Sequence, residues 1–133
     1  MFLPEAVAEQ FAAEAFAVLK PSDLEPDFPI EFYGFYTDLC TRPLFRLPEG
    51  PIAFLLDIMT TYPDAGTAQP ITGRNRIFFE RARELGGKHY PIGAIPLEAE
   101  DWRKHYAPFW EQFAAAKRRF DPDGILAPGP GIF

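Results

Sequence analysis

Apolar side chains recur at helical spacing in separate stretches of the chain. The first stretch runs from Pro4 to about Lys20, and the second runs from about Arg74 to Leu85, where Gly86-Gly87 ends it. Further helical stretches are Glu98–Tyr106, which starts with acidic residues, and Pro108–Phe120, which has a proline in its first turn. The pattern therefore predicts helices near the start, in the middle and toward the end of the chain.

Short apolar or aromatic runs between these helices are typical of strands. Ile30–Tyr36 is rich in aromatic residues and is predicted to be a strand, and Met1–Leu3 is a candidate for a shorter one. His89–Ile95 is predicted to be a short strand that Pro91 interrupts. The apolar run Pro51–Thr61 fits a helix or a strand equally well by its pattern alone.

Proline, glycine and acidic residues mark the predicted loops. Pro21–Pro29 is expected to be an acidic loop before the aromatic strand. Asp64–Gly73 is expected to be a second loop, because it combines proline with two glycines.

Composition and charge narrow the classes of function. With 133 residues and 47% apolar residues, the chain is large enough to bury the core of one small domain. Its net charge of −6 argues against nucleic-acid binding, which needs a basic face. Its single cysteine, Cys40, excludes an intrachain disulfide, and we expect a reducing cytoplasm. No apolar run approaches the roughly 20 residues of a membrane span, and no basic region typical of secretion precedes the first helix.

Residues that commonly carry out catalysis are few and scattered. His89 and His105 lie in different predicted elements, and neither H-E-x-x-H nor C-x-x-C occurs, so no metal site is predicted. His105 is more typical of a structural histidine packed among Trp102 and Trp110. The only serine, Ser22, lacks a G-x-S-x-G context, which argues against a hydrolase triad. We therefore assign no catalytic residue from the sequence.

Aromatic side chains on the predicted strand Ile30–Tyr36 are candidates for a substrate pocket. Phe32, Tyr33 and Tyr36 would line a pocket for a flat substrate. Alternation along the strand puts Phe32 and Tyr36 on one face and Tyr33 on the other, so at most one set faces a ligand. Core packing and cross-strand aromatic pairs explain the same residues without a ligand, and this alternative stays open.

The last seventeen residues, Lys117–Phe133, join the end of a helix to an apolar tail. Lys117, Arg118 and Arg119 suit a helix C-terminus, and the turn residues of Asp121–Gly124 then stop the helix. The tail beyond contains two prolines without N–H donors, so an ordinary central strand is not expected. We expect the tail to lie extended across a surface that holds it.

This tail resembles the C-terminal end of FAD-linked oxidases of the vanillyl-alcohol oxidase type, and their cytokinin dehydrogenase-like branch in particular. The similarity rests on Phe120-Asp121-Pro122, on Ile125-Leu126-Ala127-Pro128-Gly129, and on Ile132-Phe133. Upstream, Glu100–Tyr106 resembles a helix of the same family, and Phe2-Leu3-Pro4 resembles a strand end in its substrate-cap domain. The resemblance covers nearly the whole chain.

The resemblance implies a fold and a division of the chain. It favours a strand for Pro51–Thr61, paired with Ile30–Tyr36. The fold class is then α+β, with a ferredoxin-like antiparallel sheet that has helices on one face, followed by C-terminal helices and an extended tail. Residues 1–116 would form part of a substrate-cap domain, and residues 117–133 would dock on a flavin domain.

The resemblance also implies where a flavin would be approached. Two segments, Tyr90–Ala94 and Ala127–Gly131, would reach the flavin edge, which makes Ile92, Ala127, Pro128, Gly129 and Pro130 the expected cofactor contacts. Family members usually carry a glutamine at the place of Pro130, and plant members carry a tyrosine near the place of Ile92. Neither residue here offers a side-chain hydrogen bond.

The expected cofactor is FAD, bound in an intact parent protein and not by this chain alone. The chain contains neither G-x-G-x-x-G nor G-x-x-x-x-G-K-[ST] for binding phosphates. The expected partners are an N-terminal FAD-binding domain or separate subunit and a small-molecule substrate. The implied reaction of the parent is hydride removal from a carbon next to nitrogen or oxygen.

Two functions from different classes therefore stay open. The first is the substrate-cap and C-terminal portion of an FAD-dependent oxidoreductase, inactive alone. The second is a stand-alone ferredoxin-like binding or dimerisation module without catalysis, with its tail folded back on its own domain or its partner. If the sheet of the parent protein continues through strands that precede Met1, the isolated chain would present an unpaired edge and an apolar patch, and we expect it to self-associate.

Overall fold

The computed structural model describes residues 1–27, 29–62, 64–126 and 128–133. These residues form two compact units, which are described separately below. The first unit comprises residues 1–41 and 47–96, and the second comprises residues 42–46 and 97–133. In the described parts of the chain, no helix combines the length and apolar character needed to cross a membrane.

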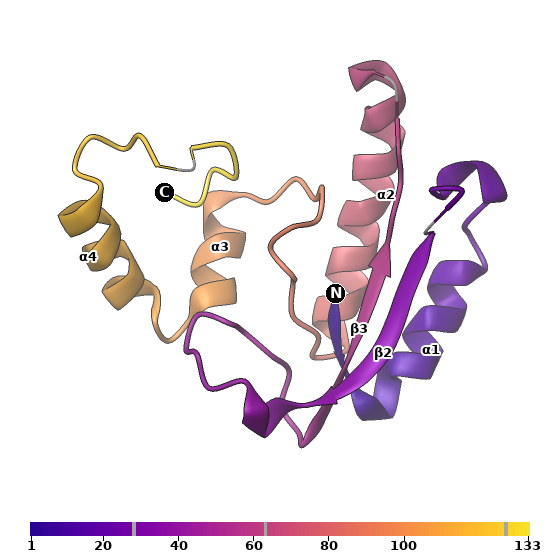
Figure 1. The fold of residues 1–133 in the computed structure, drawn as a ribbon, viewed down its shortest axis with the longest axis horizontal. Helices are drawn as coiled ribbons and strands as arrows, with labels where there is room; N and C mark the ends of the chain where they lie inside the picture. Colours follow the sequence, from indigo (N-terminus) through magenta and orange to yellow (C-terminus); the bar gives the residue numbers. More distant parts are fainter. Residues whose placement is uncertain (28, 63, 127) are drawn as a thin grey trace. The chain divides into compact units, whose positions relative to one another are not determined.

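The first unit contains an antiparallel sheet with the strand order β1-β3-β2 (Figure 1). Its strands are β1 (Phe2–Pro4), β2 (Ile30–Tyr36) and β3 (Ile52–Ile58). Pairing of β2 with β3 along their whole length confirms the strand expected within Pro51–Thr61 and its partner. Because β3 is the central strand, it is almost continuously apolar and its inner residues are buried.

Two helices cover one face of this sheet. They are α1 (Glu5–Phe16) and α2 (Ala65–Glu84). Leu3 and Leu56 point from the sheet into a core that includes Phe11 of α1 and Ala82 of α2. The α+β class and the antiparallel sheet with helices on one face are therefore confirmed.

The start of α2 contradicts the loop expected over Asp64–Gly73. The helix begins at Ala65 and continues through Pro70. Asp64 stabilises this start as its N-cap, because its Oδ1 accepts a hydrogen bond of 2.9 Å from the backbone N–H of Thr67. The loop prediction gave too much weight to glycine and proline and missed the cap.

The strand expected over His89–Ile95 is also wrong. Lys88, directly before this segment, forms an isolated β-bridge with Phe2 through two backbone hydrogen bonds of 2.8 Å. The following residues turn, with N–H groups of Ile92 and Ile95 bonding back to Tyr90 and Gly93 at 2.8 and 2.9 Å. Proline at position 91 cannot donate to a ladder, so the segment forms a loop.

Gly87 allows this loop to leave α2 close to β1. A Cβ atom at this position would lie 2.9 Å from the Phe2 carbonyl oxygen and 2.8 Å from that of Ala82. Both neighbours are backbone atoms that cannot move aside easily. The glycine therefore lets the chain pass tightly between the helix end and the sheet.

The second unit is built on helices α3 (Ala99–Tyr106) and α4 (Trp110–Phe120). The helix predicted over Glu98–Tyr106 is confirmed, whereas the one expected from Pro108 starts two residues later, at Trp110. Edge-to-face contacts link the Tyr106 ring to His105 at 4.7 Å and to Phe113 at 4.8 Å. His105 is buried in this aromatic cluster, in agreement with the structural role expected for it.

Short 3-10 helices in the first unit span Pro21–Asp23 and Thr37–Leu39.

Candidate functional site

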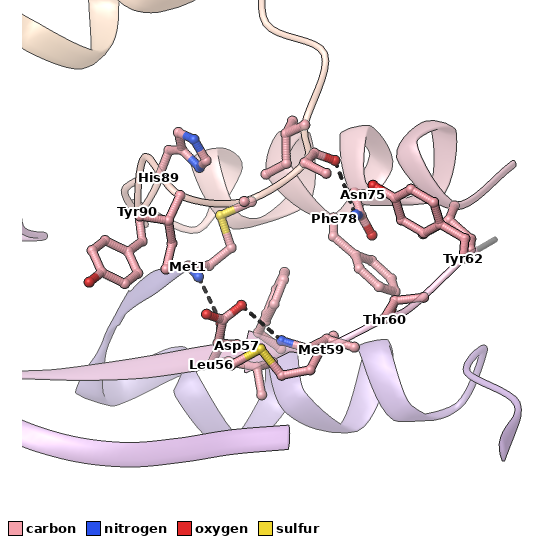
Figure 2. Close-up of a pocket in the computed structure, with 17 residues that line it drawn as sticks. Met1, Leu56, Asp57, Met59, Thr60, Tyr62, Asn75, Phe78, His89 and Tyr90 are labelled. Atoms are coloured by element: carbon pink, nitrogen blue, oxygen red, sulfur yellow. Dashed lines mark hydrogen bonds between the residues drawn. The ribbon is translucent and has the colours of Figure 1, made fainter. Parts of the chain in front are cut away.

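A cavity of about 260 Å³ opens in the first unit beside the C-terminal end of β3. Its walls come mainly from the end of β3, the inner face of α2 and the loop of residues 89–95, with Met1 and Phe11 of α1 completing them (Figure 2). Most of the lining side chains are apolar, including Met1, Phe11, Ile58, Met59, Ile71, Phe78, Ile92 and Ile95. An apolar cavity with few polar groups is the usual form of a small-molecule site.

Polar contacts hold the walls of the cavity together. Asn75 of α2 donates from Nδ2 to the carbonyl oxygen of Ala94 at 3.1 Å, which ties the loop to the helix (Figure 2). Arg76 reinforces this tie, because its guanidinium donates to the carbonyl oxygen of Pro96 at 2.9 Å. The hydroxyl of Thr60 donates to the carbonyl oxygen of Asp23 at 2.8 Å. The loop is thus anchored to α2 although it contains no strand.

Asp57 brings a carboxylate to the lining of this cavity. Its Oδ1 accepts a hydrogen bond of 3.0 Å from the backbone N–H of Ile58. Nearby, the amino group of Met1 donates to the carbonyl oxygen of Leu56 at 2.7 Å (Figure 2). Burial lowers the pKa of this amino group to about 6, and the Asp57 charge opposes that shift in part.

His89 and Tyr90 lie at the start of the loop and also line the cavity. His89 is 3% exposed and packs edge to face on Phe79, with 6.0 Å between ring centroids. From the sequence, neither a metal-binding nor a catalytic role was predicted for His89. No group of three or more potential ligating side chains occurs within the described ranges.

Asp57 and Asn75 are cavity residues that sequence reasoning missed. A usable signal existed for Asp57, because it is the only charged residue in the apolar run that became β3. Asn75 also had a usable signal, because it precedes Phe78 by three residues and Ala82 by seven on the predicted helix, which places it on the face that packs inward.

The aromatic residues of β2 lie on both faces of the sheet, as alternation requires. Phe32 and Tyr36 share the helix-covered face, where the Phe32 ring lies 5.4 Å from that of Phe54. Tyr33 lies on the opposite face with Phe35 and is 52% exposed. None of Phe32, Tyr33 and Tyr36 lines the cavity.

An aromatic row extends across the face of the sheet that bears Tyr33. The ring of Phe2 on β1 lies 5.7 Å from Phe35 and 5.1 Å from Tyr90 of the loop. The Tyr33 and Phe35 rings are 6.4 Å apart. We call Phe2, Tyr33, Phe35 and Tyr90 the aromatic row, and its Tyr90 end reaches the cavity.

The expected flavin contacts fall in both units. Ile92 lies in the first unit, lines the cavity and is 68% exposed. Pro128, Gly129 and Pro130 lie in the second unit, and Ala127 lies outside the described residues. The carbonyl oxygen of Pro130 accepts a hydrogen bond of 3.2 Å from the Trp102 indole.

The tail is held by contacts within its own unit. Asp121 is buried and accepts hydrogen bonds from the N–H groups of Ile125 and Leu126 at 2.9 and 3.0 Å and from the Lys117 ammonium group. These donors, Lys117 first, hold the pKa of the Asp121 carboxyl below its usual range. At the end of the tail, the Phe133 ring stacks on Trp110 with a centroid separation of 5.4 Å.

Comparisons with known proteins agree along the whole chain. A family model described as "Cytokinin dehydrogenase 1, FAD and cytokinin binding" matches residues 1–133. An uncharacterized oxidoreductase, ORF5 of the fasciation locus of Rhodococcoides fascians, is 35% identical over 129 residues, which cover 97% of this chain and 29% of that protein. Cytokinin dehydrogenase 8 of Oryza sativa subsp. indica is 30% identical over 146 residues, covering 100% of this chain and 27% of the rice protein. The chain therefore spans less than a third of the length of these relatives.

Proposed function

Since the chain belongs to the cytokinin dehydrogenase family that is described as binding FAD and cytokinin, we propose that it forms the substrate-side portion of an FAD-dependent oxidoreductase. The observation that carries this proposal is the match of the family model to all of residues 1–133, in a chain that covers only 29% of its Rhodococcoides relative. The remaining part of such a protein would hold the cofactor.

The described residues do not fit a complete FAD site. Ile92 and Pro130 have no side-chain donor or acceptor for a flavin ring, and the Pro130 carbonyl already accepts from Trp102. We therefore assign FAD to the rest of the protein and derive no reaction step from the residues of this chain.

In this proposal the chain forms the substrate side of the active site and excludes water from it. The cavity offers apolar walls and, through Tyr90 and Phe78, flat ring faces, which suit a planar organic ligand. Asp57 adds one carboxylate able to accept a hydrogen bond from a ligand N–H. These features fit the cytokinins for which several relatives are named.

Reconstitution tests the proposal. The chain is co-expressed with the part of the Rhodococcoides relative that lies outside the matched region, and flavin absorbance is recorded before and after anaerobic addition of a cytokinin. We expect a colourless chain alone, and a yellow complex whose flavin is bleached by the cytokinin. A stoichiometric flavin in the isolated chain, or a complex whose flavin no cytokinin reduces, would contradict the proposal.

A matched pair of variants sharpens this test. Tyr90→Ala removes the member of the aromatic row that lines the cavity and should raise the cytokinin concentration needed for half-maximal bleaching by roughly tenfold, in line with the loss of one stacking contact. Ile77→Ala changes an exposed residue of α2 outside the cavity and should leave bleaching unchanged.

One observation favours the second candidate, a stand-alone binding or dimerisation module. The tail folds back on its own unit through Phe133 and Trp110. A symmetric dimer that persists in the presence of the co-expressed flavin part, without complex formation, would support this alternative over the first.

A further inference from the structure

One edge of β3 is covered by β1 for only part of its length. The partners of β1 along β3 are Ala53, Phe54 and Leu55. Met1 extends the ladder by one step, because it exchanges hydrogen bonds of 2.9 and 2.7 Å with Leu56. Beyond Leu56, β3 continues to Ile58, and among the described residues no strand accompanies it on this side.

The backbone of Ile58 faces this open edge. Successive residues of a strand direct their N–H and C=O groups to opposite sides, and the N–H of Met59 donates toward Pro29 at the other side of β3. The Ile58 N–H instead bonds to the side chain of Asp57. A carboxylate thus occupies the place that a neighbouring strand's carbonyl oxygen would take, which is one way in which proteins protect an exposed sheet edge.

The cavity lies along this same open edge. It is lined by Leu56, Asp57, Ile58, Met59 and Thr60 of β3 and its extension, with Phe78 of α2 on the helix side. A segment added here would continue the β1 register, so the residue directly before Met1 would oppose Asp57 and the next one upstream would oppose Ile58. The position opposite Ile58 shares the helix-covered face and favours an apolar side chain.

We propose that this edge of β3 is a strand-addition site, and that its occupant is an extended segment from the remaining part of the oxidoreductase, running antiparallel to β3 in continuation of β1. The hydrogen-bonded ladder of β1 with β3 leads directly into the site, and the relatives extend well beyond the matched region. The assignment of the occupant rests on the proposed function. Backbone hydrogen bonds to Ile58 would supply affinity, and the apolar cavity wall would select the side chain opposite it.

A short extension of the chain tests the site without any flavin. The residues Thr-Thr-Val-Thr are joined to Met1, so that the valine opposes Ile58. We expect the Ile58 amide to exchange with deuterium at least roughly tenfold more slowly than in the unextended chain, because it gains a backbone partner in a closed ladder.

Two proline versions of the extension provide the matched control. Proline in place of the valine removes the N–H that would donate to the Ile58 carbonyl oxygen, which opens one of the two bonds of the pair and should lower the protection clearly. Proline in place of the last threonine removes an N–H that points away from β3, and it should leave most of the protection intact. Equal protection by both versions, or none in the original extension, would overturn the strand-addition site.

Three further outcomes bear on the occupant and on the proposed function. If the Ile58 amide of the unextended chain becomes protected as its concentration rises, a second copy occupies the edge and the assigned occupant is wrong. If the extension protects Ile58 while reconstitution with the flavin part fails, the edge site stands and the proposed function falls. Failure of the extension alongside successful flavin reconstitution would overturn the edge site only.

Discussion

At the scale of single residues, the cavity brings together groups whose behaviour depends on burial. The Met1 amino group lies next to apolar side chains and bonds to one carbonyl oxygen, with Asp57 close by. His89 and Tyr90 line the same space. Ile92, expected in a strand, lies in the loop and lines the cavity, and its contact with flavin stays a prediction.

Protonation of Met1 makes stability depend on pH. Burial lowers the pKa of the amino group from 8.0 to about 6 in the folded chain. Between these values the unfolded chain binds more protons than the folded chain, so the free energy of unfolding rises with pH. The contribution of the amino group to this free energy is lost as pH falls from about 8 to about 6. The change should reach up to about 3 kcal/mol. Urea unfolding across this range measures it.

Acetylation of the Met1 amino group provides the control for this pH dependence. The two histidines, His89 and His105, remain unchanged in the acetylated chain. The difference between the two chains therefore isolates the amino group. Identical pH profiles would show that Met1 does not cause the effect.

At the scale of elements, the helices and strands follow local pattern except where long-range contacts intervene. The aromatic strand was predicted with its observed bounds, Ile30–Tyr36. α2 extends nine residues further toward the N-terminus than predicted, because it starts at Ala65 and not at Arg74. His89–Ile95 became a loop tied to α2 by Asn75.

Pro70 offers a direct test of the observed start of α2. Inside a helix, proline removes one backbone hydrogen bond and its ring meets the carbonyl group four residues earlier, that of Gly66. Replacement by alanine should therefore stabilise the chain by about 1 kcal/mol or more. Pro91→Ala, in the exposed loop, should change the free energy of unfolding by less than about 0.5 kcal/mol. Equal effects of both changes in thermal unfolding would contradict the extended helix.

At the scale of the whole molecule, the chain corresponds to less than a third of the length of its relatives. Its first unit carries the sheet, the cavity and the aromatic row, and its second unit carries the tail. The outer edge of the sheet that β2 forms lacks a partner strand among the described residues, since β2 ends the sheet. Such edges commonly pair with other chains.

We therefore expect the isolated chain to self-associate as its concentration rises. Sedimentation should show growing species, and a hydrophobic dye should bind. Tyr33→Lys places a charge on the β2 edge strand and should shift the distribution toward the monomer. A stable monomer that does not bind the dye would count strongly against this expectation.

The sequence by itself determined the fold class, the order of most elements and the family, because apolar spacing and the tail motif are local properties. Only the tertiary structure decided that Asp57 and Asn75 meet at a cavity, that Tyr33 belongs to the open face, and that the tail bonds within its own unit. These features depend on strand register and on contacts between residues far apart in the chain. Local periodicity carries no information on such contacts.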